Sequence, residues 1–285
     1  MTAPIRMPIR IKRVLTKTAL ARQHDRALAG KLTRRIPAIP WEKFDRSKYP
    51  DAALKLAAHA QTKLALGEYG AVELFAHLAS AMSLLGVPFD LVAAAARTPS
   101  DEIRHADYAM RAAKLLSGGD VDITIDAEAV TKRWAKPIDQ EWLDHIMLEL
   151  CAVSETLSCA LLSSCMERAK DPVMHALFSG IVSDEVHHAR LGWYYFAWRA
   201  PQWTRAEQQR VADRGGQILV RLEKQFWHGR DAEPKARKAA RALGVLESEG
   251  QRATVRAVME DEIVPALDAL GLGASHAWRI RARGA

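Results

Sequence analysis

Cysteine is scarce in this chain, and the few cysteines form no metal-binding pair. Three occur in 285 residues, and no two of them stand in a C-x-x-C spacing. This argues against an iron–sulfur cluster, a rubredoxin-type iron site or a zinc site built on paired thiols. Cys151 and Cys159 are eight residues apart. That is about 12 Å along a helix, which is too far for a disulfide, and we expect reduced thiols.

Long apolar runs and secretion signals are also missing. Charges interrupt the alanine-rich stretches well before the ~20 apolar residues that a membrane-spanning helix needs. The N-terminal stretch MTAPIRMPIRIKRVL has no uninterrupted apolar segment followed by a small-residue cleavage site. We therefore expect a cytoplasmic protein with no membrane segment.

Strand patterns are absent as well, because no stretch shows the β-branched alternation of a strand. Segments rich in alanine and leucine at helical spacing predict two helical hairpins, at 51–119 and 137–200, with a kink or short break at Pro99. Further helices are expected at about 204–228, 234–245 and 247–270. The sequence therefore predicts an all-α protein.

The net charge of +7 is spread unevenly. Residues 1–48 carry 13 Lys and Arg against 3 Asp and Glu, residues 49–198 carry 12 against 20, and residues 199–285 carry 16 against 11. Charge and helical patterns together predict three parts: a basic N-terminal arm at 1–50, a four-helix bundle at 51–200, and C-terminal helices packed on the bundle at 201–285.

Two interpretations of the basic arm stay open. Such arms bind nucleic acid, an acidic partner protein or a membrane surface. For this chain, tRNA and an acidic carrier protein are the macromolecular partners that we consider. The alternative is a solvated extension that covers the protein's own acidic middle, or that of a partner copy in a homodimer.

One phrase occurs twice in the chain. SDEIRHA at 100–106 returns as SDEVHHA at 183–189, and the two copies differ only at their fourth and fifth positions. Residues three apart share a helix face, so Glu102 projects with His105 and Glu185 projects with His188. A single E-x-x-H is often a hydrogen-bonded core pair. Two copies at equivalent places in two hairpins favour metal ligands.

Each hairpin should add a carboxylate from its first helix, at the level of the glutamate on its second helix. The residue opposite Glu102 lies near position 72, which selects Glu73. The residue opposite Glu185 lies near position 158, and Glu155 is within one helical turn of it. Both carboxylates interrupt apolar stretches, where they need a partner such as a metal to remain ionised.

Two other glutamates fit these levels less well. Glu68 lies about four residues too deep in the first hairpin, or ~6 Å at the helical rise, and Glu149 lies further out in the second. The expected site therefore holds four glutamates and two histidines: Glu73, Glu102, His105, Glu155, Glu185 and His188.

This donor set favours iron or manganese. Carboxylate oxygens with one imidazole per metal suit these ions in their divalent and trivalent states, whereas copper and zinc would more often recruit the thiols. Two iron ions are preferred, and Mn/Fe or Mn/Mn pairs are left open.

In these residues the chain resembles the ferritin-like superfamily of dimetal-carboxylate proteins. The resemblance covers roughly 51–199, about half of the chain. The phrase DEIRH is similar to the motifs of soluble bacterial multicomponent monooxygenases, in which the aspartate holds the histidine of the opposite motif. The resemblance implies a ferritin-like four-helix bundle in which Asp101 orients His188 and Asp184 orients His105. A carboxylate in that position fixes the tautomer of the ligand and raises its basicity.

The resemblance also implies an activity. It implies an O2-activating non-haem di-iron oxygenase or oxidase that hydroxylates, N-oxygenates or desaturates a small organic substrate, with the six ligands as its catalytic residues. No flavin or nucleotide motif is evident, so electrons would come from a separate reductase. Stand-alone dimetal N-oxygenases are close in size, but they carry an extra histidine where this chain has Ile181.

Three alternatives to this activity are left open. A ferroxidase or a manganese catalase would use the same ligands without an organic substrate. A di-iron hydroxylase would act on tRNA or on a carrier-bound substrate held by the basic arm. A metal-free scaffold would bind neither iron nor manganese.

Tyr108 has two interpretations. It lies three residues after His105, near enough to the ligands for a redox-active or hydrogen-bonding role beside the metals. Packing between helices is the alternative, and it is the one that we favour.

Overall fold

The described part of the chain is helical throughout. The computed structural model describes residues 22, 38–119, 121, 138–225 and 231–280, and no strand occurs among them. Most of the basic arm predicted at 1–50 lies outside these residues. Three elements are short 3₁₀ helices: η1 (Trp41–Lys43), η2 (Arg46–Lys48) and η4 (Ala200–Gln202). Two are π-helical: η3 (Met147–Ser154) and η5 (Met259–Ile263). The α-helices are α2 (Asp51–Leu84), α3 (Phe89–Ser117), α5 (Gln140–Ile146), α6 (Glu155–Arg168), α7 (Pro172–Arg199), α8 (Arg205–Gln225), α9 (Arg237–Ala242), α10 (Ser248–Val258), α11 (Val264–Ala269) and α12 (Ala274–Ile280).

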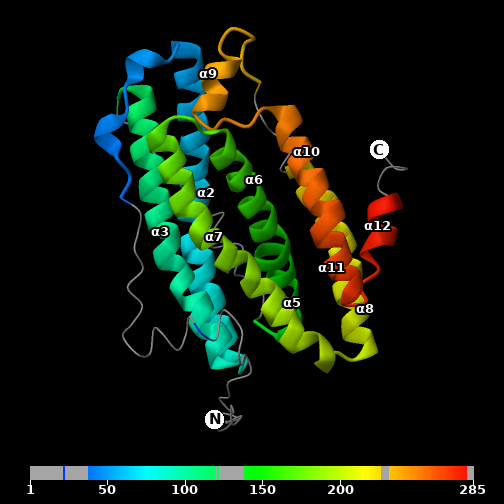
Figure 1. The fold of residues 1–285 in the computed structure, drawn as a ribbon. Coiled ribbons are helices and arrows are strands. Elements are labelled where there is room, and N and C mark those ends of the chain that lie inside the picture. Colours follow the sequence, from blue (N-terminus) through cyan, green and yellow to red (C-terminus); the bar gives the residue numbers. More distant parts are fainter. Residues whose placement is uncertain (1–21, 23–37, 120, 122–137, 226–230, 281–285) are drawn as a thin grey trace.

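Two helical hairpins form the centre of the molecule (Figure 1). In the first hairpin α2 packs along α3, and in the second α7 packs along α6 and the π-helix η3 that precedes α6. The hairpins contact each other chiefly where α3 meets α7. This is the pairing that the helical patterns predicted.

Local sequence signals set the turns of both hairpins. Gly86, just after α2, has a φ of 70°, a left-handed conformation that glycine adopts without strain. Asp171 caps α7, because its carboxylate accepts hydrogen bonds from the backbone N–H groups of Val173 and Met174 at 2.9 and 3.1 Å. The predicted break at Pro99 is absent, since α3 runs through this residue without interruption.

The buried apolar side chains form two clusters. One includes Phe75, Leu91, Leu148 and Tyr195, and the other includes Leu54, Leu116, Leu162 and Leu177. On α2, α3 and α7 a stretch of helix that belongs to neither cluster separates the two, and this stretch carries buried charged side chains. The polar layer across the middle of the hairpins is therefore the place where a functional site is expected.

The C-terminal helices pack on the hairpins. Helix α10 lies along α6, α8 contacts α5 and η3, and α9 contacts α2 near the end where the chain enters the hairpins (Figure 1). Buried Asp144 joins α5 to the end of α7, since its carboxylate accepts hydrogen bonds from the Tyr195 hydroxyl at 2.5 Å and from Arg199 Nε at 3.3 Å. The aromatic stretch at this end of α7 thus has a packing role.

One described helical segment, Gln140–Arg168, is long and apolar enough to cross a membrane by length and composition. Half of its most apolar window is buried inside the molecule, against α7 and α10. A core helix passes the same test, because its buried face is also apolar. The expectation of a cytoplasmic protein with no membrane segment stays a prediction.

Candidate metal centre

The two copies of the repeated phrase face each other in the polar layer. Glu102 and His105 lie on α3, Glu185 and His188 lie on α7, and all four side chains are buried. The centroids of the two imidazole rings are 5.9 Å apart. Nδ1 of His105 lies 3.1 Å from Oε1 of Glu185, and Nδ1 of His188 lies 3.1 Å from Oε1 of Glu102. Each histidine therefore lies against the glutamate of the opposite phrase.

The donor atoms of the polar layer form two overlapping groups. Within each group the ligand atoms all lie within 4.8 Å of one another. The first group is Glu68, Glu102, His105 and Glu185, and the second is Glu102, Glu155, Glu185 and His188. Glu102 and Glu185 thus belong to both groups, between the two histidines. All six side chains are buried, which is compatible with a metal site.

The carboxylate from α2 is Glu68, and the prediction of Glu73 is corrected. Oε2 of Glu68 lies 3.4 Å from Nδ1 of His105, whereas Glu73 belongs to neither group of donors. Phe75 faces the centre, with its ring centroid 5.9 Å from that of His188. Glu73 is two residues from Phe75, which on a helix is a rotation of about 200°, so the two side chains leave α2 on different sides.

The helix face that carries Glu68 was readable in the sequence. Residues seven apart lie on nearly the same helix face, and positions 54, 61, 68, 75 and 82 are all buried. Three of the other four residues, Leu54, Phe75 and Met82, are apolar, so the periodicity of this face marks Glu68 as a core carboxylate. Position along the hairpin selects Glu73, whereas the buried face of the helix selects Glu68.

Glu155 is the first residue of α6 and directly follows the π-helix η3. Its Oε2 lies 4.0 Å from Nδ1 of His188. Glu149, in η3, instead points toward Arg214 and Arg221 of α8 and forms ion pairs with both. Glu155 therefore belongs to a donor group, and Glu149 belongs to neither. Short π-helical stretches are frequent at functional sites because they shift the register of a helix.

An aspartate from each phrase reaches the histidine of the other. Oδ2 of Asp184 lies 3.2 Å from Nε2 of His105, and Oδ2 of Asp101 lies 3.5 Å from Nε2 of His188. This is the crossed pairing that the resemblance implied. A histidine that donates from Nε2 leaves Nδ1 with its lone pair facing the glutamates, and Nδ1 is the atom that would bind a metal.

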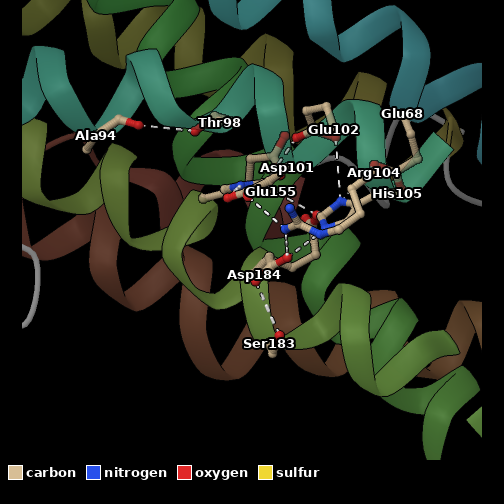
Figure 2. A network of polar contacts seen from close by, with 12 residues as sticks. Glu68, Ala94, Thr98, Asp101, Glu102, Arg104, His105, Glu155, Ser183 and Asp184 are labelled. Atoms are coloured by element: carbon tan, nitrogen blue, oxygen red, sulfur yellow. Dashed lines mark hydrogen bonds and ion pairs between the residues drawn. The ribbon is translucent and has the colours of Figure 1, made fainter. Parts of the chain in front are cut away.

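Arg104 joins the two aspartates. Its Nη2 donates a hydrogen bond to Oδ1 of Asp101 at 2.7 Å and another to Oδ2 of Asp184. Figure 2 shows this guanidinium between the two carboxylates, beside Glu102 and His105. A single cation therefore pairs with both aspartates and fixes their positions relative to the two histidines. No pattern in the sequence predicts this role of Arg104.

Tyr108 is half-buried and lies beside the centre. Its ring centroid is 6.3 Å from that of Trp41. The ring also lies close to Gly180, because a Cβ atom added to this glycine would be 3.5 Å from Cε2 of Tyr108. Burial raises the pKa of its hydroxyl. These contacts support the packing interpretation of Tyr108.

Burial divides the four glutamates into two kinds. Burial raises the pKa of Glu68 and of Glu155 well above the usual range, and neighbouring carboxylates raise it further. Burial acts in the same direction on Glu102 and Glu185, but contacts with both histidines outweigh it and lower the pKa of these two carboxyls. The two glutamates shared by the groups are therefore the ones that stay ionised most readily.

The histidines show that the centre stabilises positive charge. Burial alone would lower the pKa of both imidazoles. The surrounding carboxylates, Asp184 foremost for His105 and Asp101 foremost for His188, outweigh burial and raise the pKa of each. A layer of four glutamates and two aspartates at this depth is a strong attractor for cations.

The donor set fits hard metal ions of the iron and manganese kind. The atoms that face the centre are carboxylate oxygens and one imidazole nitrogen from each half. Among the described residues, Nδ1 of His105, Nδ1 of His188 and Oε1 of Glu185 are buried atoms that make no hydrogen bond of good geometry. Buried polar atoms of this kind call for a bound partner.

A groove opens beside the centre, between α2, α6 and the segment that follows α9. Its volume is about 790 Å³. It starts on α2 at Leu64, one helical turn before Glu68, and on α6 at Ser158, one turn after Glu155. The groove therefore begins next to the metal-ligand candidates and runs away from them toward α9.

Comparisons with known proteins add no relative. No protein-family model, curated protein or solved structure matches the chain significantly.

Proposed function

We propose that the chain is an O2-activating non-haem di-iron oxygenase or oxidase with a ferritin-like four-helix bundle. One observation carries the proposal: two groups of buried donors share Glu102 and Glu185, and each group adds one histidine and one further glutamate. That pattern suits two metal ions, and Glu102 and Glu185 would serve both. Glu68 and His105 would complete one metal position, and Glu155 and His188 the other.

Two iron ions held there would supply the one-electron redox chemistry that O2 reduction requires. The protein residues have separate tasks. Asp101 and Asp184 hold the histidines with Nδ1 toward the centre, and Arg104 holds the aspartates. The apolar clusters on both sides of the polar layer exclude water from it. Electrons would come from a separate reductase.

The groove favours an organic substrate over metal storage. A protein that only oxidises or stores metal ions needs a path for ions, whereas this groove has the volume of a small-molecule site, for which ~300–1,000 Å³ is typical. Most of its lining is apolar. We therefore prefer an oxygenase to a ferroxidase or a manganese catalase. The variant of the proposal that uses the basic arm depends on residues that the structure does not describe.

Metal content is the decisive test. Purified protein should contain about two iron or manganese ions per chain by elemental analysis, and the double variant E102A/E185A should contain almost none, because both shared ligands are lost. The reduced iron form should consume O2, and the double variant should not. A matched control is Glu73→Ala, which removes a carboxylate of α2 outside the donor groups and should keep the metal.

Three results would contradict the proposal or favour another class of protein. Wild-type protein without iron or manganese after growth with both metals would leave a metal-free scaffold. Retention of metal in the double variant would place the ions elsewhere. A large hollow assembly on sizing, with O2 consumed only while free Fe²⁺ is added, would favour a ferroxidase.

A further inference from the structure

We propose that the groove beside the centre binds an amphipathic carboxylic acid, with its carboxylate toward the metal ligands and its apolar body toward α9. The inference rests on the proposed function, since it names the substrate class of that same site. It follows from where the groove lies, from how polarity is distributed along it, and from one buried amide that no described residue satisfies.

The position of the groove relates it to the centre. It is lined by side chains of α2 between Leu56 and Leu64 and of α6 between Ser158 and Cys165. On α2 this stretch covers about 12 Å at ~1.5 Å per residue, and it ends about 6 Å before Glu68. A molecule in the groove therefore has one end about one helical turn from Glu68 and the other end near α9.

The buried apolar part of the groove lies toward α9, and polar side chains, His59 and Gln251 among them, also line the groove. Near the centre the lining includes three side chains that can donate hydrogen bonds, from Gln61, Lys63 and Ser158. Toward α9 the lining includes Phe178, Leu243 and Val245, which are buried. A ligand that matches both ends has an acceptor group near the metals and an apolar body that extends away from them.

Gln61 supplies an independent sign of a ligand. Its side chain is 3% exposed, it lines the groove, and its Oε1 atom is buried without a hydrogen bond from any described residue. An unsatisfied buried amide is costly, and a bound polar group removes that cost. Because amide oxygen and nitrogen can exchange places by a flip, Gln61 can donate to a carboxylate through Nε2.

Charge selects an acid over an amine. The lining contains Lys63 at its edge and no Asp or Glu among the described residues. A carboxylate next to Lys63 gains a charge-assisted hydrogen bond, whereas an ammonium group finds no acidic partner in the groove. Lys63 is exposed, so its replacement tests the charge without disturbing the core.

Binding of decanoic acid tests this assignment, with decylamine as the cationic analogue. Calorimetric titration of the full chain should show decanoate binding about tenfold or more tightly than decylamine. Lys63→Glu should weaken decanoate about tenfold, because attraction becomes repulsion. Lys55→Glu makes the same charge change at an exposed site of α2 outside the groove, and its effect should stay within about twofold.

A second variant examines the buried amide. Gln61→Leu keeps the volume of the side chain and removes its hydrogen bonds, so it should weaken decanoate several-fold without loss of folding. Equal binding of acid and amine would overturn the assignment. So would equal effects of Lys63→Glu and Lys55→Glu, or absence of decanoate binding to wild-type protein.

Orientation is measured with Mn²⁺ as a paramagnetic probe. In protein loaded with Mn²⁺, the NMR signals of the decanoate carbon next to the carboxylate should broaden more than those of the terminal methyl group. The E102A/E185A variant with the same Mn²⁺ added is the reference, because broadening there comes from ions free in solution. Stronger broadening of the methyl group would overturn the orientation.

These results separate the inference from the proposed function. Absence of decanoate binding to protein that carries two metals would remove the inference and leave the di-iron proposal standing. Absence of metal from the wild-type protein removes the di-iron proposal, and with it the assignment of decanoate as a substrate analogue.

Discussion

The two halves of the candidate centre are built from the same phrase but complete it differently. In the first half, Glu68 lies as many residues before the end of α2 as His105 lies after the start of α3. In the second half, the same equality holds for Glu155 on α6 and Glu185 on α7. The added carboxylate therefore stands opposite the histidine in the first half and opposite the glutamate in the second.

This difference of about one helical turn follows from which face of the helix points inward. A carboxylate on α2 reaches the centre only from the face that also carries Phe75, and Glu68 is the acid on that face. In the second half, η3 widens the helix just before Glu155. A repeated phrase thus sets the inner ligands symmetrically, whereas each hairpin supplies its outer ligand according to its own helix.

The outer residues of the two phrases differ as well. Arg104, in the first phrase, bridges both aspartates. His187 stands at the matching place in the second phrase and is half-buried. One half therefore carries the cation that organises both histidines, and the two donor groups are not equivalent in their surroundings.

The largest effect is expected where the second half depends on a direct backbone contact. A Cβ atom at Gly192 would lie 2.3 Å from the backbone N of Ala152 in η3, so Gly192→Ala forces α7 and η3 apart. We expect a loss of about 3 kcal/mol in the free energy of unfolding. Gly180→Ala is the matched control on the same helix, since its nearest contact is an ordinary 3.5 Å. Urea unfolding compares the two, and equal midpoints would show that α7 and η3 do not touch as described.

Removing the outer carboxylates should separate the two metal positions. Glu68→Ala and Glu155→Ala each take one ligand from one donor group and leave the other group complete. We expect each variant to retain about one metal ion per chain where wild type holds two, with the affinity of the affected position reduced ~100-fold. Elemental analysis after gel filtration measures the ratio. Loss of both ions from either variant would mean that the halves do not bind independently.

Metal binding should displace protons from both halves. Burial raises the pKa of Glu68 and Glu155, and the surrounding carboxylates raise the pKa of His105 and His188, so a metal ion competes with protons for these groups. The affinity for Mn²⁺ should therefore fall as pH falls. Competition with a chelator between pH 6 and pH 8 measures this slope. A slope of opposite sign would contradict the assignment.

A smaller effect is expected from the cation that only the first half carries. Arg104→Met keeps much of the side-chain volume and leaves Asp101 and Asp184 without their shared donor. Both histidines then lose orientation, and we expect about tenfold weaker metal binding at both positions. His187→Ala should change the affinity by less than about twofold, because His187 belongs to neither donor group. An equal effect of the two variants would remove the distinction between the halves.

Much of this centre could be predicted from residue spacing. The E-x-x-H pairs follow from the three-residue spacing on a helix, and the two hairpins follow from apolar periodicity and from turns at Gly86 and Asp171. Glu155 could be predicted from its position along the hairpin alone, because it lies directly opposite Glu185. Glu68 could not be predicted in this way. In the first hairpin the position along the helix favours Glu73, whereas the helix face that points to the centre carries Glu68.

Other features had no signal in the sequence. The π-helix η3 lies in a stretch that reads as an ordinary apolar helix, and its extra residue per turn is stabilised by contacts with α7 at Gly192 and with α8. The bridge that Arg104 makes joins residues 80 positions apart. The groove depends on α9 and its following segment covering α2 and α6. Such contacts depend on packing between distant segments, which local propensity does not encode.

By itself the sequence determined the helices, the pairing of each glutamate with a histidine, and the presence of two such pairs in two hairpins. These are local properties, because helical geometry alone places residues three apart on one side. Only the tertiary structure decided which further carboxylates join them, which aspartate meets which histidine, and where a groove reaches the centre. Those outcomes depend on the rotation and depth of one helix against another, which the packing of all the buried side chains sets together.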